Sequence, residues 1–196
     1  MEVNCHCPAP IGTNSETQSP VGSTGFYLNT DHPAPCNGTI NGLRYCSYKP
    51  NDIKNDRNYK TTFAIYRAVN TGYQRMSNVI TVSRHGSELS QWFNCYNVSI
   101  NGFTIQAGDM VAACIYDPNG GSRQLDVVGW THNVGDSLMR MNDVSQCRET
   151  SLPSNISNSR LSEVNWRILH LYATITGIFF NIVSFLLTLS KLFFLQ

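Results

Sequence analysis

The stretches TTFAIYRAV (61–69) and DMVAACIYD (109–117) decide the fold class of this chain. In the first stretch, Phe63, Ile65 and Arg67 alternate with Ala64, Tyr66 and Ala68. The second stretch shows the same alternation over residues 110–115. Aromatic and β-branched residues that repeat with a period of two are typical of β-strands, whereas a helical stripe repeats about every 3.6 residues. Both stretches are therefore predicted to be strands.

Similar runs recur along the chain between turn signals. Asn-Gly pairs at 37–38, 41–42 and 101–102, together with DPNGG at 117–121, break the chain into short segments, as tight turns do. About seven strands at this spacing, with no amphipathic helix between them, predict an antiparallel β-sandwich or jelly roll over residues 25–144. The other predicted strands are GFYLN (25–29), LRYCSY (43–48), QRMSNVITVS (74–83), WFNCYNVSI (92–100) and LDVVGWT (125–131).

The run ILHLYATITGIFFNIVSFLLTL (168–189) contains no Asp, Glu, Lys or Arg. A helix of about 20 apolar residues spans the ~30 Å hydrocarbon core of a bilayer. Arg167 and Lys191 flank the run, where long cationic side chains reach the lipid headgroups. The sequence therefore predicts a transmembrane helix over 168–190, in contact with membrane lipid, and a short tail over 191–196. A glycolipid anchor is the alternative, because small residues and a polar spacer precede the run.

Two polar segments flank the predicted sandwich. Residues 1–24 contain several Pro and Gly residues and no hydrophobic period, which predicts a flexible N-terminal segment. Residues 145–167 are predicted to be a polar stalk leading to the membrane. The first residues, MEVNCHCPAPIG, do not have the pattern of a secretion signal. A tail-anchored domain in the cytosol is therefore an alternative to the preferred location, a domain displayed outside the plasma membrane.

Seven cysteines stand at positions 5, 7, 36, 46, 95, 114 and 147. A single residue separates the first two, and this spacing does not match a zinc site. Disulfides formed in an oxidising compartment are predicted instead. Cys36 and Cys46 flank an Asn-Gly turn region, and Cys95 and Cys114 lie in neighbouring predicted strands, so we predict the pairs Cys36–Cys46 and Cys95–Cys114. The partners of Cys5, Cys7 and Cys147 stay open.

Three sequons are present, Asn37-Gly38-Thr39, Asn97-Val98-Ser99 and Asn155-Ile156-Ser157. In a secreted or membrane protein this pattern marks an acceptor for an N-linked glycan. We therefore predict glycosylation at Asn37, Asn97 and Asn155.

One short motif suggests an enzyme. Residues 135–138 spell GDSL, the nucleophile block of an esterase and lipase family in which a downstream histidine supplies the base. Here the only histidine after Ser137 is His170, and a serine without a nearby base is a poor nucleophile. A cell-surface hydrolase that uses Ser137, or the carboxylates Asp109, Asp117 and Asp126, is therefore only an alternative. No catalytic residue is predicted.

The sequence predicts no cofactor and no metal ion. The loops NDIKNDRN (51–58) and DPNGG (117–121) carry oxygen ligands suitable for calcium, but neither matches the EF-hand template. The net charge is +1, with both signs scattered, which argues against a nucleic-acid partner. Only 14% of the residues are charged, against ~25% in ordinary soluble domains.

The block FNC…QAGDMVAAC…LDVVG resembles a family of invertebrate membrane-anchored, β-rich ectodomains. The resemblance covers about residues 25–130. It implies a cell-surface β domain and brings no particular activity with it.

The preferred hypothesis is a single-pass membrane protein. It would display a disulfide-stabilised β-sandwich outside the cell for adhesion or for recognition of an extracellular protein or glycan. This step rests on architecture, because a fold alone does not define a function.

Overall fold

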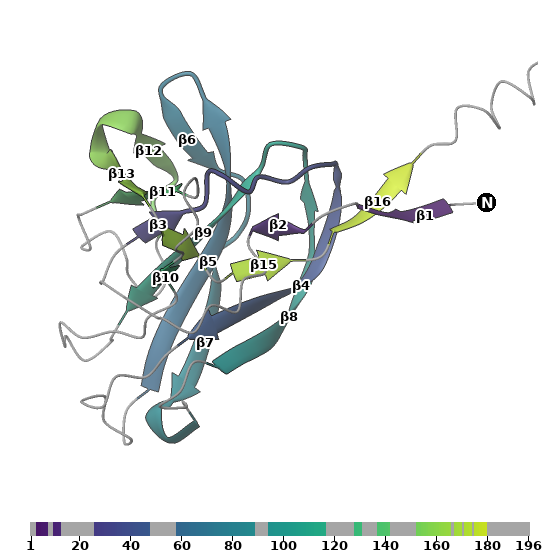
Figure 1. The fold of residues 1–196 in the computed structure, drawn as a ribbon. Coiled ribbons are helices and arrows are strands. Elements are labelled where there is room, and N and C mark those ends of the chain that lie inside the picture. The colour runs from purple at the N-terminus through teal and green to yellow at the C-terminus, as the bar shows by residue number, and fades with distance from the viewer. Residues whose placement is uncertain are drawn as a thin grey trace, which may run out of the picture.

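The computed structural model describes residues 3–7, 10–12, 26–47, 58–88, 94–116, 128–130, 137–141, 152–165, 167–169, 171–173 and 175–179. These residues form an all-β structure in which every strand pairing is antiparallel (Figure 1). The all-β class predicted from the alternating stretches is confirmed.

An eight-stranded sheet forms the centre of the molecule. Its strand order is β12-β6-β5-β9-β3-β11-β13, and β7 pairs with β5 on the same side as β6. The long strands β5 and β9 correspond to the two stretches that decide the fold. The strands are β3 (Phe26–Leu28), β5 (Asn58–Val69), β6 (Gly72–Arg75), β7 (Ile80–His85), β9 (Met110–Tyr116), β11 (Ser137–Met141), β12 (Asn155–Ser157) and β13 (Leu161–Asn165).

A six-stranded sheet packs against the first. Its order is β1-β16-β4-β15-β2, with β8 paired to the other side of β4. A separate two-stranded sheet consists of β10 (Val128–Trp130) and β14 (Arg167–Leu169). The strands of the six-stranded sheet are β1 (Val3–His6), β2 (Ile11–Gly12), β4 (Gly38–Ser47), β8 (Asn94–Ile105), β15 (Leu171–Ala173) and β16 (Ile175–Phe179). Two 3-10 turns, η1 (Gly86–Glu88) and η3 (Asn158–Arg160), lie between strands.

The space between the two sheets is filled by one hydrophobic core. Ile40 and Tyr45 of β4 pack there with Phe63 of β5 and Val111 of β9. The rings of Tyr45 and Phe63 meet across the sheets with centroids 5.2 Å apart. These contacts define the packing of two β-sheets face to face, with side chains of alternate parity pointing inward from each strand.

A second core covers the opposite face of the eight-stranded sheet. Phe26, Tyr66 and Met110 from its strands pack there against Leu152 and Ile156. The Tyr66 hydroxyl donates a hydrogen bond of 2.7 Å to the carbonyl of Pro153. The prediction of a polar stalk over 145–167 is therefore wrong for residues 152–165, which cover the central sheet and contribute β12 and β13.

Part of the C-terminal apolar run is also built into the sandwich. Leu171, Ala173 and Ile175 are fully buried in the core between the sheets. The transmembrane helix predicted over 168–190 is therefore wrong for residues 168–169, 171–173 and 175–179, which belong to strands β14 to β16. A short apolar run that forms a buried strand cannot be told from a helical segment by hydrophobicity alone. Among the described residues no helix is long and apolar enough to cross a membrane.

The first residues of the chain pair with this C-terminal region. β1 lies antiparallel to β16, with Cys5 opposite Gly177, and β2 pairs with β15, with Ile11 opposite Ala173 (Figure 1). The flexible segment predicted over 1–24 is thus wrong for residues 3–7 and 10–12. The β-structure extends beyond the predicted range of 25–144 at both ends.

A glycine permits the close approach of β2 to β15. Gly12 has φ +83, and a Cβ built on it would lie 2.1 Å from the carbonyl oxygen of Leu171. Gly108, in the turn before β9, has a similar φ of +89, but a Cβ there would meet nothing within 4 Å. Substitution of Gly108 therefore costs only the strain of the left-handed backbone. Substitution of Gly12 costs the same strain and, in addition, a collision with the backbone of Leu171.

We predict that Gly12→Ala lowers the free energy of unfolding by roughly 3 kcal/mol, because it adds a clash with backbone to the left-handed strain. Gly108→Ala, the matched control, should cost only about 1 kcal/mol from that strain alone. Urea denaturation of the two variants measures the difference. Equal losses would contradict the close approach of β2 to β15.

A second prediction concerns alkaline stability. Burial raises the pKa of Tyr66 above its ordinary value, and burial also raises the pKa of Tyr45. Unfolded tyrosine ionises near pH 10, so the unfolded state loses its protons first as the pH rises. The free energy of unfolding should be constant up to about pH 9 and fall above about pH 10.

Tyr66→Phe tests this expectation. In this variant the free energy of unfolding should fall less steeply above about pH 10. At neutral pH it should be about 1 kcal/mol lower than in the parent, because the hydrogen bond to Pro153 is lost. Denaturation curves across the pH range give both quantities. An unchanged slope would show that Tyr66 is not a buried neutral phenol.

Candidate functional site

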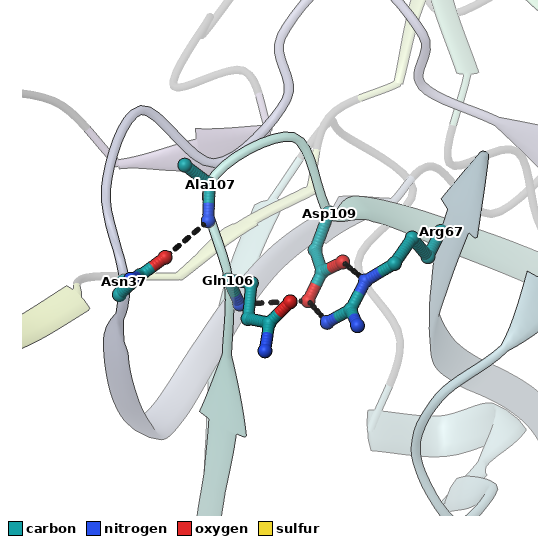
Figure 2. A network of polar contacts seen from close by, with 5 residues as sticks. All are labelled: Asn37, Arg67, Gln106, Ala107 and Asp109. Atoms are coloured by element: carbon teal, nitrogen blue, oxygen red, sulfur yellow. Dashed lines mark hydrogen bonds and ion pairs between the residues drawn. The ribbon is translucent and has the colours of Figure 1, made fainter.

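The turn between β8 and β9 is organised around a buried carboxylate. The side chain of Asp109 is 0% exposed. It accepts two hydrogen bonds from Arg67 of β5, Nε to Oδ1 at 2.7 Å and Nη2 to Oδ2 at 2.9 Å. The backbone N–H of Gln106 donates to the same Oδ2 at 2.8 Å (Figure 2). Both oxygens are thus engaged, and a paired fork geometry of this kind is among the stronger polar contacts in proteins.

The loop that follows β3 is fastened to the same turn. The N–H of Ala34 donates to the carbonyl of Asp109 at 2.6 Å, and the N–H of Gly108 donates to the carbonyl of Ala34 at 2.8 Å. Asn37 accepts a hydrogen bond of 2.8 Å from the N–H of Ala107 through its side-chain oxygen (Figure 2). The loop and the turn therefore form one rigid unit at this end of the sandwich.

The Arg67–Asp109 pair has a structural role. The hydrogen bond to Asp109, reinforced by the negative charge, raises the pKa of Arg67. The Asp109 carboxylate is completely buried and both of its oxygens accept hydrogen bonds from the protein, so it is not accessible to a substrate. The alternative hypothesis that Asp109 is catalytic finds no support in this geometry, and Asp117 and Asp126 lie outside the described residues.

A groove opens at the edge of the sandwich, where the connection between β6 and β7 faces the end of β8. Its volume is about 450 Å³, within the range of ~300–1,000 Å³ typical of small-ligand sites. Ile65 and Phe103 contribute apolar surface, and the other lining residues are mostly polar. The full lining is Ile65, Arg75, Met76, Ser77, Asn78, Gly102, Phe103, Thr104 and Ser154.

A second, smaller hollow of about 340 Å³ lies beside the turn between β5 and β6. Val69, which is 42% exposed, lines it together with Tyr73 and Arg160. Burial raises the pKa of Tyr73. Asn155 also lines this hollow, so a glycan on that residue would stand at its mouth.

An arginine joins the two sheets along the same edge. Arg84 of β7 donates from Nε to the hydroxyl of Tyr45 at 2.9 Å, and its guanidinium lies 4.1 Å from the centroid of the Tyr96 ring. A guanidinium placed over an aromatic face is attracted by the ring electrons. This contact ties the edge strand β7 to β4 and β8.

The disulfide bonds join different pairs of cysteines from those predicted from the sequence. Cys7 is bonded to Cys36 and Cys46 to Cys95, and Cys114 is disulfide-bonded with a partner other than Cys95. The predicted pairs Cys36–Cys46 and Cys95–Cys114 are therefore wrong. Cys46 lies directly opposite Cys95 in the β4–β8 register, and Cys7 comes from the N-terminal segment expected to be flexible.

The three sequon asparagines are all exposed. Asn37 lies in the loop before β4, Asn97 in β8 and Asn155 in β12. Asn37 uses its side-chain oxygen to hold Ala107, and a glycan would be attached through its nitrogen. Their exposure is compatible with glycosylation, which stays a prediction.

Only some of the other residues considered for catalysis or metal binding lie in the described part of the chain. Ser137 begins β11, opposite Asn165 of β13 in an antiparallel sheet, whereas the esterase block follows a strand of an α/β fold. His170 and both candidate calcium loops lie outside the described residues, apart from Asn58 at the end of the first. Within the described ranges, no three His, Cys, Asp or Glu side chains gather as a metal site would require.

Aromatic side chains could contact a sugar or a protein partner where they are exposed, and those of this chain divide into two groups by burial. Tyr27 and Tyr45 are buried core residues, whereas Tyr73 and Tyr96 are partly exposed. Trp92 and Phe93 lie outside the described residues.

The sequence did not predict the groove, because the residues that line it come from four separate segments of the chain. An arginine inside the apolar stretch 61–69 was the one signal that could have indicated the pair with Asp109.

Comparison of the chain with models of protein families, with curated proteins and with solved structures finds no match in any of the three. The resemblance to invertebrate ectodomains therefore stays a prediction.

We predict that Asp109→Ala lowers the free energy of unfolding by about 3 kcal/mol. The substitution leaves the charge of Arg67 without its ion-pair partner and the N–H of Gln106 without its acceptor. The double variant Arg67→Met/Asp109→Leu removes both charges and should lose less. Urea denaturation of the oxidised protein measures both. A double variant less stable than the single one would contradict the stranded-charge explanation.

Proposed function

We infer that this chain is a recognition domain that works outside the cytosol and binds an extracellular protein or glycan. The observation that carries the proposal is the set of disulfides, Cys7–Cys36 and Cys46–Cys95 together with a bonded Cys114. Disulfides of this number form and persist in oxidising compartments and are rare in the cytosol. The tail-anchored cytosolic alternative has no comparable support.

The rigid surface of the sandwich supports the binding part of the proposal. The Arg67–Asp109 pair fixes the turn and loop at one end, and the groove and the smaller hollow lie on the surface between strands. Binding residues held by a rigid scaffold lose little conformational entropy when a ligand binds. N-linked glycans at Asn37, Asn97 and Asn155 form part of the same proposal.

Attachment to the plasma membrane stays a prediction. Residues 171–173 and 175–179 form strands of the six-stranded sheet, so membrane contact would depend on the apolar residues 180–190, which lie outside the described part of the chain. The hydrolase alternative also stays open, although the antiparallel setting of Ser137 does not favour it.

The proposed function predicts the covalent state of the native protein. Isolated from cells with a thiol-blocking reagent present, it should give linked peptides for Cys7–Cys36 and Cys46–Cys95. It should also lose mass on treatment with a glycosidase that removes N-linked glycans. On arrays of extracellular proteins and glycans it should bind specific members, and Ser137→Ala should bind the same ones.

Three outcomes would contradict the proposal. Free thiols at the four bonded cysteines, without any glycan, would place the domain in a reducing compartment. Absence of binding on both arrays would remove recognition as the function. Ester hydrolysis that disappears in Ser137→Ala would establish the hydrolase instead.

A further inference from the structure

The groove at the sandwich edge has a frame that is held before any ligand arrives. The N–H of Ile65 donates to the hydroxyl of Ser77 at 2.9 Å, and the N–H of Met76 donates to the carbonyl of Ile65 at 2.8 Å. The Ser77 hydroxyl in turn donates to the carbonyl of Asn78 at 2.9 Å. These bonds attach the β6–β7 connection to β5 and engage the hydroxyl of Ser77 both as a donor and as an acceptor.

Three other polar side chains of the groove are free to bind a ligand. Asn78, Thr104 and Ser154 are exposed, and their side chains have no hydrogen-bond partner among the described residues. An amide and two hydroxyls at one groove offer both donors and acceptors. A ligand rich in hydroxyl groups matches such a lining.

The groove also carries a positive charge, that of Arg75. The side chain of Arg75 donates from Nη1 to the carbonyl of Leu152 and pairs with no acidic residue in the described part of the chain. None of the lining residues is acidic. A guanidinium in this position favours an anionic group, and a carboxylate fits its planar donor geometry.

Apolar surface completes the groove. Met76 is 44% exposed, unusually so for a large apolar side chain in this fold, and Phe103 is partly buried beside it. A pyranose ring has C–H faces that pack on such side chains, with its hydroxyls directed to the polar rim. The lining therefore matches a sugar more closely than it matches a free inorganic anion.

We propose that this groove binds a carboxylate-bearing sugar, such as a uronic or sialic acid residue at the end of a glycan. Asn78, Thr104 and Ser154 bind the hydroxyl groups, Arg75 attracts the carboxylate, and Met76 and Phe103 contact the ring. This inference rests on the proposed recognition function and names its ligand class. An acidic peptide is the rival, but peptides are commonly recognised through main-chain bonds to a strand edge, and the free groups here are side chains.

The test uses the full oxidised chain in mild detergent, labelled with nitrogen-15. Glucuronic acid and N-acetylneuraminic acid are the acidic probes, glucose and galactose are the neutral comparators, and an acidic hexapeptide represents the rival. The acidic sugars should shift the amide signals of Asn78 and Thr104 and bind more tightly than the neutral sugars. Asn78→Ala and Thr104→Val should each weaken this binding about tenfold, the loss expected for one hydrogen bond to a ligand.

Ser83→Ala is the matched control, because Ser83 is an exposed hydroxyl on the edge strand β7 outside the groove lining. It should bind as the parent does. Met76→Ala gives a second variant that removes contact area without removing a polar group, and it should also weaken binding. Amide spectra of the free variants report whether each is folded.

Equal binding of neutral and acidic sugars, tighter binding of the peptide, or no shift with any sugar would each overturn the proposal. So would groove variants that bind as well as Ser83→Ala does. Failure here is distinguishable from failure of the recognition function. A chain that still binds protein ectodomains on an array, while ignoring every sugar, keeps the recognition function and loses only the sugar site.

Discussion

The need to cover both faces of the eight-stranded sheet governs the rest of this structure. In β5, Phe63 and Ile65 face the core between the sheets, while Ala64 and Tyr66 face the second core. Strand β9 divides in the same way, with Val111 on one side and Ala112 on the other. A sheet that is apolar on both faces needs two covers. The six-stranded sheet provides one, and residues around Leu152 and Ile156 provide the other.

This constraint explains how the polar features are placed. Asp109 and Arg67 lie at the end of the central sheet, where the β8–β9 turn meets the loop after β3. A buried carboxylate is tolerated there because a guanidinium and a backbone N–H satisfy it. The groove lies at the edge of the sandwich, where free polar side chains stay in contact with water. Rigid and accessible polar groups therefore occupy different positions in the same fold.

The strands could be predicted because alternation is a local property. The stretches 61–69 and 109–117 became β5 and β9 with small changes in their ends. The disulfides could not be predicted, since Cys46 meets Cys95 through the pairing of whole strands and Cys7 meets Cys36 across a long separation in sequence. The prediction of a transmembrane helix from the C-terminal apolar run was wrong for another reason. Hydrophobicity alone does not distinguish a buried strand from a membrane helix, and the burial of Leu171, Ala173 and Ile175 between the sheets is visible only in three dimensions.

The pairing of β2 with β15 has a consequence for biosynthesis. Ile11 lies beside Ala173, so the core between the sheets cannot close until almost all of the described chain has left the ribosome. Contacts between residues so far apart in sequence slow folding and leave apolar strands exposed in the meantime. The nascent chain would therefore depend on chaperones until residues 171–179 emerge. Truncation before these residues should yield an aggregating product rather than a smaller domain.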